Sequence, residues 1–557
     1  SLGSPTTLQA PEQSGAFFME FCPSDDLTST GAIPMPNRPN ILFLLSDEHS
    51  FRFLSTRSPE RGGEPCRTPT LDHLIQQGVH FETAYCQVPL CTPSRMSMLS
   101  GRHSHRCPVL WPDTPTFASH LGQHGYATAA VGKMHLQGSR QYAGFGARPY
   151  GDFDAPSPGH QKDPLFLPGI QDHIFMPSII EDAGLSDIPE SLLQEQFVVR
   201  EATAWLREHR HAHPDQPWLM YTSFVHPHFP MNAPRRFFER YYPEGVTPPR
   251  VGRNGDAQNH PMTLEALRSD SGESQGHPAE EITEDQTLRA RAAYAACVDQ
   301  LDEIIGDFLA VLERDGLLDN TVIVYTSDHG ELAGEHGLWW KQTWHEASVR
   351  VPLIVSLPEH RRGQLPPTEI AAPVSLADIF PMLCGLTDAP LLDDLDGIDL
   401  TPVVRGDVCP ALAARPGVIV ENLGKGYRMI RSPRYKYIAF HTYEDLAFDL
   451  IDDQDEQHNL AGHAAGETAA ELEQLKSALF EGFDFAEAME STRRESAQYR
   501  KQYPSRIKPR TSNQIMRGDG MLVEADQPLY YPDVVSQDPR RDFSDCPQQR
   551  RASRRRR

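Results

Sequence analysis

The chain contains neither a long apolar run nor a dense set of cysteines. No stretch of its 557 residues approaches the length of a membrane-spanning helix, and residues 1–37 hold no apolar core of the kind that a signal peptide has. Nine cysteines, an odd number spread thinly along the chain, do not suit a disulfide framework and favour a reducing compartment. We therefore expect no membrane span and favour the cytoplasm, with the periplasm or the exterior as alternatives if a leader has been removed before Ser1.

Positive charge is also scarce. The 52 basic side chains stand against 76 acidic ones, which gives a formal net charge of -24. Such a balance argues against nucleic acid or an anionic membrane as a general partner. Residues 550–557 are rich in arginine, but a terminal run of this kind is usually a solvated tail. Hydrophobic residues at 39% and charged residues at 23% are ordinary for a globular protein.

Buried strands that end in an aspartate occur at two distant places. Asn40–Ser46 is an apolar run of strand length that leads into Asp47, and Thr321–Ser327 is a second run that leads into Asp328. Pro352–Leu357 adds a further apolar run of the same length. Uninterrupted apolar runs of this length are typical of strands that are covered on both faces.

Short helices are predicted between these strands. Pro69 after Thr68 starts one that ends before Gly78, and Pro115 after Thr114 starts another in the same way. An N-terminal threonine with proline at the first helical position is a common way to begin a helix.

Two longer helices follow. An amphipathic stretch over residues 191–209 precedes the strand predicted at Trp218–Val225. Thr283 and Gln286 form a capping box that opens a long amphipathic helix, which Gly316 closes. Strands that alternate with helices predict an α/β fold with a mostly parallel sheet sandwiched by helices. Ligands bind such sheets at the carboxyl ends of the strands, where both strand-end aspartates should meet.

The pattern along the chain predicts four regions. Residues 1–37 form an N-terminal extension, and residues 38–413 form the α/β domain, with a polar insertion at 251–282. Residues 414–485 carry short strands and one helix, which predicts a smaller C-terminal α+β domain. Residues 486–557 lack clear periodicity and are expected to form an extended segment, which could wrap a neighbouring copy in a homo-oligomer.

Cys91 stands at the start of a short helical stretch that Gly101 stops. The free N–H groups at a helix N-terminus favour an anion there. A lone cysteine is nevertheless most often a buried core residue, which is the role we expect for Cys86, Cys297 and Cys384.

The residues around Cys91 alter that expectation. Cys91-Thr92-Pro93-Ser94-Arg95, followed by Leu99-Ser100-Gly101-Arg102, resembles the signature of the formylglycine-dependent sulfatases of the alkaline-phosphatase-like superfamily. Further family motifs occur in order: Pro39-Asn40-Ile41 with Asp47, Gly132-Lys133-Met134-His135, Pro227-His228-Phe229-Pro230, Ser327-Asp328-His329-Gly330-Glu331, and Gly334-Glu335-His336-Gly337-Leu338 with Lys341. Each motif alone is weak, but the ordered set, spread over roughly residues 37–462, is specific.

The resemblance implies how the site would work. A formylglycine-generating enzyme would convert Cys91 to formylglycine, whose hydrate would attack the sulfur of a sulfate ester and form a covalent sulfoenzyme. The implied roles are steadying of the modified side chain by Arg95, sulfate binding by Lys133, His228 and Lys341, donation of a proton to the leaving alcohol by His228 or Lys341, and removal of the second hydroxyl proton by His135. His226 is the near alternative to His228.

The resemblance also implies a divalent metal. Its ligands would be Asp47, Glu48, Asp328 and His329 together with residue 91, and Ca²⁺ is favoured, with Mg²⁺ and Mn²⁺ as alternatives. Glu48 departs from the family, which commonly has aspartate or glutamine there. The structural alternative is that these strand-end carboxylates only cap helices.

Two other functions stay open at this point. Relatives with the same fold and the same modified cysteine cleave phosphonate monoesters or phosphodiesters, and an inactive homologue would bind a sulfate or phosphate group without turnover. The substrate expected is a small-molecule or saccharide sulfate ester, and the sequence leaves open whether the leaving group is an aryl alcohol, a sugar or choline.

Overall fold

The computed structural model describes residues 38–137, 140–151, 180, 183–186, 189–252, 260–262, 282–503, 514–516 and 522–524. The N-terminal extension predicted at 1–37 and most of the polar insertion predicted at 251–282 lie outside these residues. In the described part, no helix is both long and apolar enough to cross a membrane.

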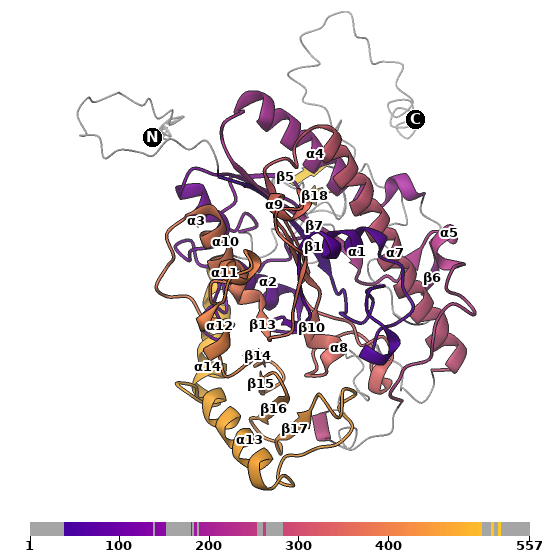
Figure 1. Ribbon diagram of the computed structural model, residues 1–557, viewed down its shortest axis with the longest axis vertical. Helices are drawn as coiled ribbons and strands as arrows, with labels where there is room; N and C mark the ends of the chain where they lie inside the picture. Colours follow the sequence, from indigo (N-terminus) through magenta and orange to yellow (C-terminus); the bar gives the residue numbers. More distant parts are fainter. Residues whose placement is uncertain are drawn as a thin grey trace, which may run out of the picture. The chain divides into compact units, whose positions relative to one another are not determined.

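An eight-stranded sheet forms the centre, with the strand order β12-β2-β11-β9-β1-β7-β4-β5 (Figure 1). Its strands are β1 (Asn40–Asp47), β2 (Val79–Phe81), β4 (Ala127–Gly132), β5 (Ala147–Tyr150), β7 (Trp218–Pro227), β9 (Thr321–Ser327), β11 (Leu353–Ser356) and β12 (Thr368–Ile370). All neighbouring pairs are parallel except the two that involve β11. The predicted α/β fold with a mostly parallel sheet is therefore confirmed.

Helices cover both faces of this sheet. In Figure 1, α1, α4 and α7 lie on one side of the strands, and α2, α3 and α10 lie on the other. The bounds are α1 (Pro69–Gln76), α2 (Cys91–Ser100), α3 (Phe117–Gln123), α4 (Gln194–Ala212), α7 (Glu284–Arg314) and α10 (Ile379–Thr387). The capping box predicted for the longest of them, α7, is present. The Thr283 side chain accepts a hydrogen bond from the Gln286 amide, and the Gln286 side chain accepts one from the Thr283 amide.

The central strand β1 is buried on both faces, as its uninterrupted apolar sequence predicted. Ile41, Phe43 and Leu45 belong to the core under α2, α3 and α10, whereas Leu42 and Leu44 belong to the core under α1, α4 and α7. Successive side chains of a strand point to opposite faces, so one apolar run supplies both cores. This double burial fixes the position of β1, and with it the acidic residues at its carboxyl end.

Smaller elements surround the sheet. Three short strands, β3 (Ala84–Tyr85), β10 (Arg350–Val351) and β13 (Val374–Ser375), form a second sheet, and β6 (Gly184–Leu185) pairs with β8 (Asn232–Ala233). Further α-helices in the described ranges before residue 415 include α5 (Arg235–Phe238), α8 (Glu346–Val349), α9 (Pro358–Arg361), α11 (Thr401–Val404) and α12 (Pro410–Ala414). Short 3-10 turns there include Pro59–Arg61, Glu190–Leu192, Glu335–Gly337 and Leu376–Asp378.

The C-terminal part has an antiparallel sheet of four strands, which Figure 1 shows at the bottom of the view. Its elements are β14 (Val418–Asn422), β15 (Tyr427–Arg431), β16 (Tyr435–Phe440), β17 (Leu446–Asp449) and the helix α13 (Gly466–Leu479). Further along the chain, β18 (Gln514–Met516) pairs antiparallel with β19 (Leu522–Glu524). One face of the four-stranded sheet packs into the same core as α2 and α10, and the other face packs on α13. The C-terminal strands thus extend the core of the main sheet.

Three local predictions need correction. The strand predicted at Pro352–Leu357 runs antiparallel to its neighbours as β11, because the segment between it and β9 carries only short helical turns and does not cross over the sheet. The helix predicted from Pro115 begins at Phe117, since Thr116 rather than Thr114 makes the capping bonds, with Ser119. Residues 486–502, expected to lack regular structure, belong to α14 (Phe485–Gln502), which the Asp484 side chain caps.

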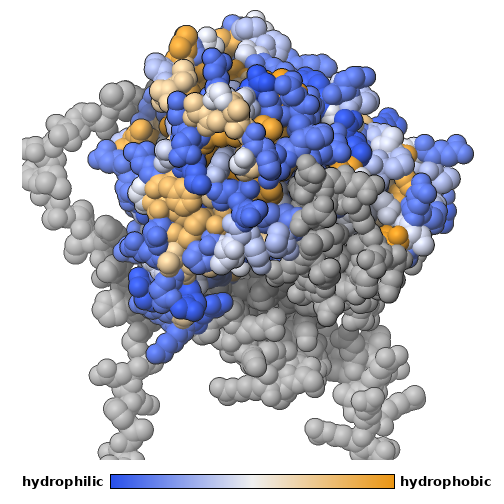
Figure 2. Space-filling model, turned by 90° about the horizontal axis from the view of Figure 1, so that it is seen from below, coloured by the Kyte–Doolittle hydropathy of each residue, from blue (hydrophilic) through white to orange (hydrophobic). Residues whose placement is uncertain are grey.

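The surface seen in Figure 2 is mostly hydrophilic, with small separate hydrophobic patches. Large hydrophobic side chains that are exposed include Leu391, Val408 and Ile451, which come from different parts of the chain. Scattered exposed apolar residues are normal for folded proteins.

Candidate active site

The carboxyl ends of β1 and β9 bring Asp47 and Asp328 together. The two strands are parallel neighbours with Ser46 opposite Ser327, so the aspartates that follow lie at the same edge of the sheet. The Glu48 amide donates a hydrogen bond of 3.1 Å to Asp328 Oδ1 across this edge. Both carboxylates are fully buried.

Arg95 lies between the two aspartates and binds one oxygen of each. Its Nη2 is 2.9 Å from Asp47 Oδ2, and its Nε is 2.7 Å from Asp328 Oδ2. A third bond, of 2.9 Å, goes from Nη1 to Ser223 Oγ on β7. The fork of the guanidinium matches such planar, paired acceptors. Arg95 therefore fixes both carboxylates through Oδ2 and leaves each Oδ1 for other partners.

His329 occupies the space beside those Oδ1 atoms. Its Nε2 lies 3.6 Å from Asp47 Oδ1 and 3.6 Å from Asp328 Oδ1. The other ring nitrogen, Nδ1, lies 3.0 Å from the Gly330 carbonyl oxygen, which can only accept, so Nδ1 carries a proton and Nε2 faces the carboxylates. Burial lowers the pKa of His329, but the Asp328 charge and the bond to Cys91 raise it to about 9.

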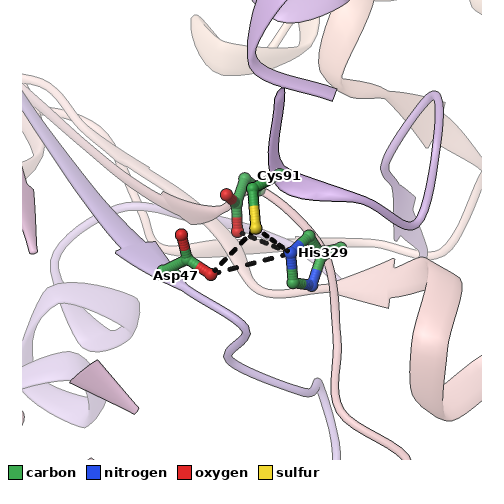
Figure 3. A group of neighbouring side chains, drawn as sticks. Asp47, Cys91 and His329 are labelled. Carbon is green, nitrogen blue, oxygen red and sulfur yellow. Dashed lines mark hydrogen bonds and ion pairs between the residues drawn. The ribbon is translucent and has the colours of Figure 1, made fainter. Parts of the chain in front are cut away.

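Cys91 completes this group (Figure 3). Its Sγ is 3.2 Å from His329 Nε2, 3.1 Å from Lys341 Nζ and 3.6 Å from Asp47 Oδ1. The residue is the first of α2, so its side chain also stands at the N-terminal end of a helix. Burial raises the pKa of the thiol, but Lys341, His329 and other cationic neighbours lower it well below its usual value. The surroundings of position 91 therefore favour negative charge on its side chain.

Ligand-type atoms of Asp47, Cys91, Asp328 and His329 all lie within 4.8 Å of one another. Two carboxylate oxygens, one imidazole nitrogen and one further donor at a strand edge form a set that suits a divalent cation. In the described residues this donor set is buried, and the bond from Nδ1 of His329 to the Gly330 carbonyl oxygen turns Nε2 toward the carboxylates, where a bound cation would take the place of the Nε2 proton. These residues thus fit the predicted metal.

Lys133 and His135 follow β4 at the same edge. Lys133 Nζ lies 2.9 Å from Asp47 Oδ2, and His135 forms a side-chain hydrogen bond with the Cys91 thiol. The Thr92 hydroxyl donates 2.7 Å to the His135 carbonyl oxygen, which ties the start of α2 to this loop. Gly132 permits the close passage of β4, because a Cβ there would collide with the Ser223 carbonyl.

Glu48 lies with His228 and Lys341. Its Oε2 is 3.0 Å from Lys341 Nζ and 3.2 Å from His228 Nε2. It belongs to a second group of possible ligands with Asp47 and His228, and Asp47 is also part of the group that contains Asp328 and His329. Burial and the nearby Glu331 carboxyl raise the pKa of Glu48 well above its usual value, against the opposing charges of Lys341 and His228.

The backbone at Glu48 adopts a positive φ of 68°, which is uncommon for a residue with a side chain. The Tyr294 hydroxyl from α7 donates 2.5 Å to the Glu48 carbonyl oxygen, and the same hydroxyl accepts from the Ser50 amide at 2.9 Å. A buried aromatic side chain from another element therefore holds the turn that aims Glu48 at Lys341.

The structure separates His228 from the nearby His226. His228 Nδ1 lies 2.7 Å from the Phe229 carbonyl oxygen, so this nitrogen carries a proton and Nε2 points to the carboxylates. The His226 amide instead donates 3.1 Å to Glu195, a residue of α4 outside the group. Of the two histidines, His228 is the one that the fold brings to the site.

Some residues at the site carried no specific expectation from the sequence. Ser94 donates to the Asp328 carbonyl oxygen at 2.5 Å, and Ser223 accepts from Arg95. Glu331 accepts the amides of Ala333 and Trp340 at 2.8 Å and 2.7 Å, which shapes the loop that leads to Lys341. Glu331 stood in a recognisable motif, but nothing in the sequence pointed to Ser223 within a buried strand.

His336 and His345 lie elsewhere, in a buried network with Glu456 and Lys436. The imidazole rings stack with centroids 3.8 Å apart, and Lys436 Nζ lies 2.7 Å from Glu456 Oε1. Stacked rings direct their in-plane lone pairs side by side rather than at one point, which is a poor arrangement for sharing a metal. The three cysteines expected in the core, Cys86, Cys297 and Cys384, are all buried.

Comparison with protein families and curated proteins gives consistent matches. The model of the family described as sulfatase matches residues 39–389. The choline-sulfatase of Rhizobium meliloti is 29% identical over 447 residues, which cover 77% of this chain and 83% of that protein. The ulvan-active sulfatase of Formosa agariphila is 28% identical over 458 residues, which cover 78% of this chain and 79% of that protein.

Solved structures share the fold. A phosphonate monoester hydrolase of Agrobacterium radiobacter superposes with a TM-score of 0.64 at 23% identity, over 87% of this chain and 99% of that one. A protein solved in complex with its substrate D-glucosamine-2-N,6-O-disulfate superposes with a TM-score of 0.62 at 23% identity, over 85% of this chain and 100% of that one.

Proposed function

The chain belongs to the sulfatase family of hydrolases, and from that premise we propose that it cleaves sulfate monoesters with a formylglycine derived from Cys91 as nucleophile. The observation that carries the proposal is the position of Cys91 Sγ, 3.1 Å from Lys341 Nζ and 3.2 Å from His329 Nε2 at the start of α2. A nucleophile that carries negative charge is stabilised by such neighbours. Oxidation by a formylglycine-generating enzyme would supply the aldehyde, whose hydrate offers the attacking hydroxyl.

Asp47, Asp328, His329 and residue 91 would hold the divalent cation. When bound, the cation would lower the pKa of the attacking hydroxyl and neutralise charge that develops on the sulfate group. Two carboxylates in the donor set favour a hard cation, and Ca²⁺ is the ion that we propose.

The cationic side chains around position 91 have distinct tasks in this proposal. Lys133 and Lys341 bind sulfate oxygens and compensate the charge of the transition state. His228, whose Nε2 is held 3.2 Å from Glu48 Oε2, stands where it can give a proton to the leaving alcohol. Arg95 holds Asp47 and Asp328 rather than the substrate. His135, hydrogen-bonded to the Cys91 side chain, removes the proton of the second hydroxyl, so that sulfate leaves the covalent intermediate.

Relatives point to the substrate class. One curated relative is an ulvan-active sulfatase, another is a choline-sulfatase, and one protein of the same fold was solved with a disulfated glucosamine as its substrate. We therefore propose a small sulfate ester as substrate, with sulfated saccharides as the first class to test. The polar insertion at residues 251–282 and the loop after His135 supply the variable part of such a scaffold.

Phosphonate monoester hydrolysis is the competing function, because hydrolases of that kind share the fold. The matured protein should be assayed on an aryl sulfate and on the matched aryl phosphodiester and phosphonate monoester. A kcat/KM at least tenfold higher for the sulfate supports the proposal, and a preference of orders of magnitude for a phosphorus ester rejects it. A panel of sulfated sugars, aryl sulfates and choline sulfate then identifies the leaving group, and complete inactivity of the fully matured protein would favour a binding-only homologue.

A further inference from the structure

A cavity of about 230 Å³ away from Cys91 is lined by five arginines. Arg52, Arg57 and Arg61 come from the segment after β1, Arg350 begins β10, and Arg431 ends β15. Three carboxylates, those of Glu82, Glu346 and Asp455, share the wall with them. In a protein with a net charge of -24, this cavity concentrates positive charge.

The carboxylates are too few to neutralise these cations. Glu82 alone pairs with three of the arginines, through contacts of 2.5 Å to Arg57, 2.8 Å to Arg61 and 2.7 Å to Arg350. Glu346 is shared with Lys436, whose Nζ lies 3.0 Å from Oε1. Arg61 also pairs with Glu369 at 3.0 Å, and Arg350 with Glu346 at 3.5 Å. Among the residues that line the cavity, five arginines still stand against three carboxylates.

Three of the guanidinium groups pack around the ring of Phe51. Arg57 and Arg350 lie over the ring of Phe51 with centroid distances of 4.5 Å and 4.3 Å, and Arg52 lies 5.7 Å from the same ring. Burial and the charge of Arg350 lower the pKa of Arg57 to about 10, against the attraction of Glu82. Side chains that are already fixed lose little entropy when a ligand binds them.

Arg61 gives a ligand access to the cavity, whereas Arg52 and Arg57 lie deeper in its wall. The Nε atoms of Arg52 and Arg57 are buried and have no hydrogen-bond partner in the described part of the chain. The Arg52 and Arg57 side chains are only 4% and 9% exposed, whereas Arg61 is 44% exposed and marks the open side of the cavity. Buried N–H donors without a partner are costly and are normally satisfied.

We propose that this cavity is a second binding site that takes a tetrahedral oxyanion, sulfate or phosphate, either free or as the ester group of a small molecule. Guanidinium forks suit the oxygens of such anions, which accept several charge-assisted hydrogen bonds at once. The cavity volume of about 230 Å³ lies below the range of about 300–1,000 Å³ typical of sites for larger ligands. The site does not depend on the chemistry proposed at Cys91.

The test is calorimetric titration of the full chain with inorganic sulfate at fixed ionic strength. The unaltered protein is compared with Gln454→Glu, which places a carboxylate on the exposed side of the cavity without removing any ion pair, and with Arg61→Met. Gln364→Glu, on an exposed turn after α9, is the matched control for added charge. Melting temperatures without sulfate establish that each variant is folded.

We expect the unaltered protein and Gln364→Glu to bind one more equivalent of sulfate than Arg61→Met. We expect Gln454→Glu to weaken the binding of that sulfate about fivefold, because the new carboxylate has the same sign of charge as the ligand. The test compares the number of sulfate ions bound by the unaltered protein with the number bound by the variants. A sulfate that also binds near Cys91 adds equally to both numbers and does not affect their difference. Equal stoichiometry and affinity in all four folded proteins would overturn the proposal.

Further titrations identify the source of the oxyanion. Inorganic phosphate and a sugar monosulfate are used as ligands in Cys91→Ala protein, which prevents turnover. If Gln454→Glu weakens the binding of inorganic sulfate or phosphate but the sugar monosulfate does not bind, the cavity takes the free anion. If Gln454→Glu weakens the binding of the sugar monosulfate, the cavity takes the ester. Binding of none of these ligands at this cavity would also reject the proposal.

Discussion

Lys341 Nζ lies 3.0 Å from Glu48 Oε2 and 3.1 Å from Cys91 Sγ, so one buried ammonium joins the strand-end acid to the proposed nucleophile. The Glu48 carboxylate faces Lys341 and His228 and is not part of the group formed by Asp328 and His329. Its contribution should therefore be to position these two cationic side chains.

Glu48→Gln should keep metal and lose turnover. The amide cannot balance the Lys341 charge, so kcat should fall about 10- to 100-fold, as is typical when a group that orients an active-site side chain is removed. Metal content by atomic emission should stay at one equivalent, and Glu48→Asp, which restores the charge, should recover part of the activity. Loss of the metal from Glu48→Gln would instead make Glu48 a ligand, as the sequence motif suggested.

Arg95→Met should destabilise the protein severely. It would leave the buried Asp47 and Asp328 without their shared cation, and breaking such a buried pair costs about 3–5 kcal/mol. Urea unfolding measures the change. Arg235→Met, which removes an exposed i,i+4 pair with Glu239, is the control and should change the free energy of unfolding by less than about 0.5 kcal/mol. Similar losses in both variants would contradict the bridging role of Arg95.

The positions of Asp47 and Asp328 could be predicted because the rule that ligands lie at the carboxyl ends of parallel strands is a property of the fold. The bridge through Arg95 could not be predicted, because a sequence motif does not show that one guanidinium group binds the Oδ2 atoms of two different carboxylates. The strand at β11 could be predicted from its apolar run, but its direction could not, because direction depends on the path of the connection and not on apolar content. The helix α14 could not be predicted from apolar periodicity, because only Phe485, Ala488, Ser496 and Tyr499 of its residues are buried.

Removal of the metal should abolish activity reversibly. Chelation followed by Ca²⁺ should restore turnover, and Mg²⁺ should restore less of it because Mg²⁺ gives up its bound waters reluctantly and prefers oxygen ligands alone. Asp328→Asn should lose the metal even before chelation, since one charged ligand is gone. Full activity of a sample shown to be metal-free would contradict the assignment of Asp47, Asp328 and His329.

Glu421 should make the stability depend on acid pH. It is buried on β14, and hydrogen bonding and charge from His105, with Arg428, lower its pKa to about 2 despite burial. Because the pKa is lower in the folded state, the stabilisation is present above the unfolded value of about 4.3 and is lost as pH falls towards 2.

Urea unfolding of Glu421→Gln and the unaltered protein measures this contribution. The variant should be less stable by about 3 kcal/mol at pH 7 and at pH 5, and the difference should shrink to about half at pH 3. A difference that stays constant over this pH range would mean that the Glu421 charge is not what stabilises the contact between β14 and the loop after α2.

Cys91 is the proposed source of the nucleophile, and the mass of the peptide that contains residue 91 shows whether the cysteine has been converted. The peptide should be measured in protein that was produced together with a formylglycine-generating enzyme and that hydrolyses a sulfate ester. We expect the mass of an aldehyde at position 91, in a fraction that rises in proportion to specific activity, and no turnover in folded Cys91→Ala. Full activity in protein whose residue 91 is entirely unmodified cysteine would rule out formylglycine as the nucleophile.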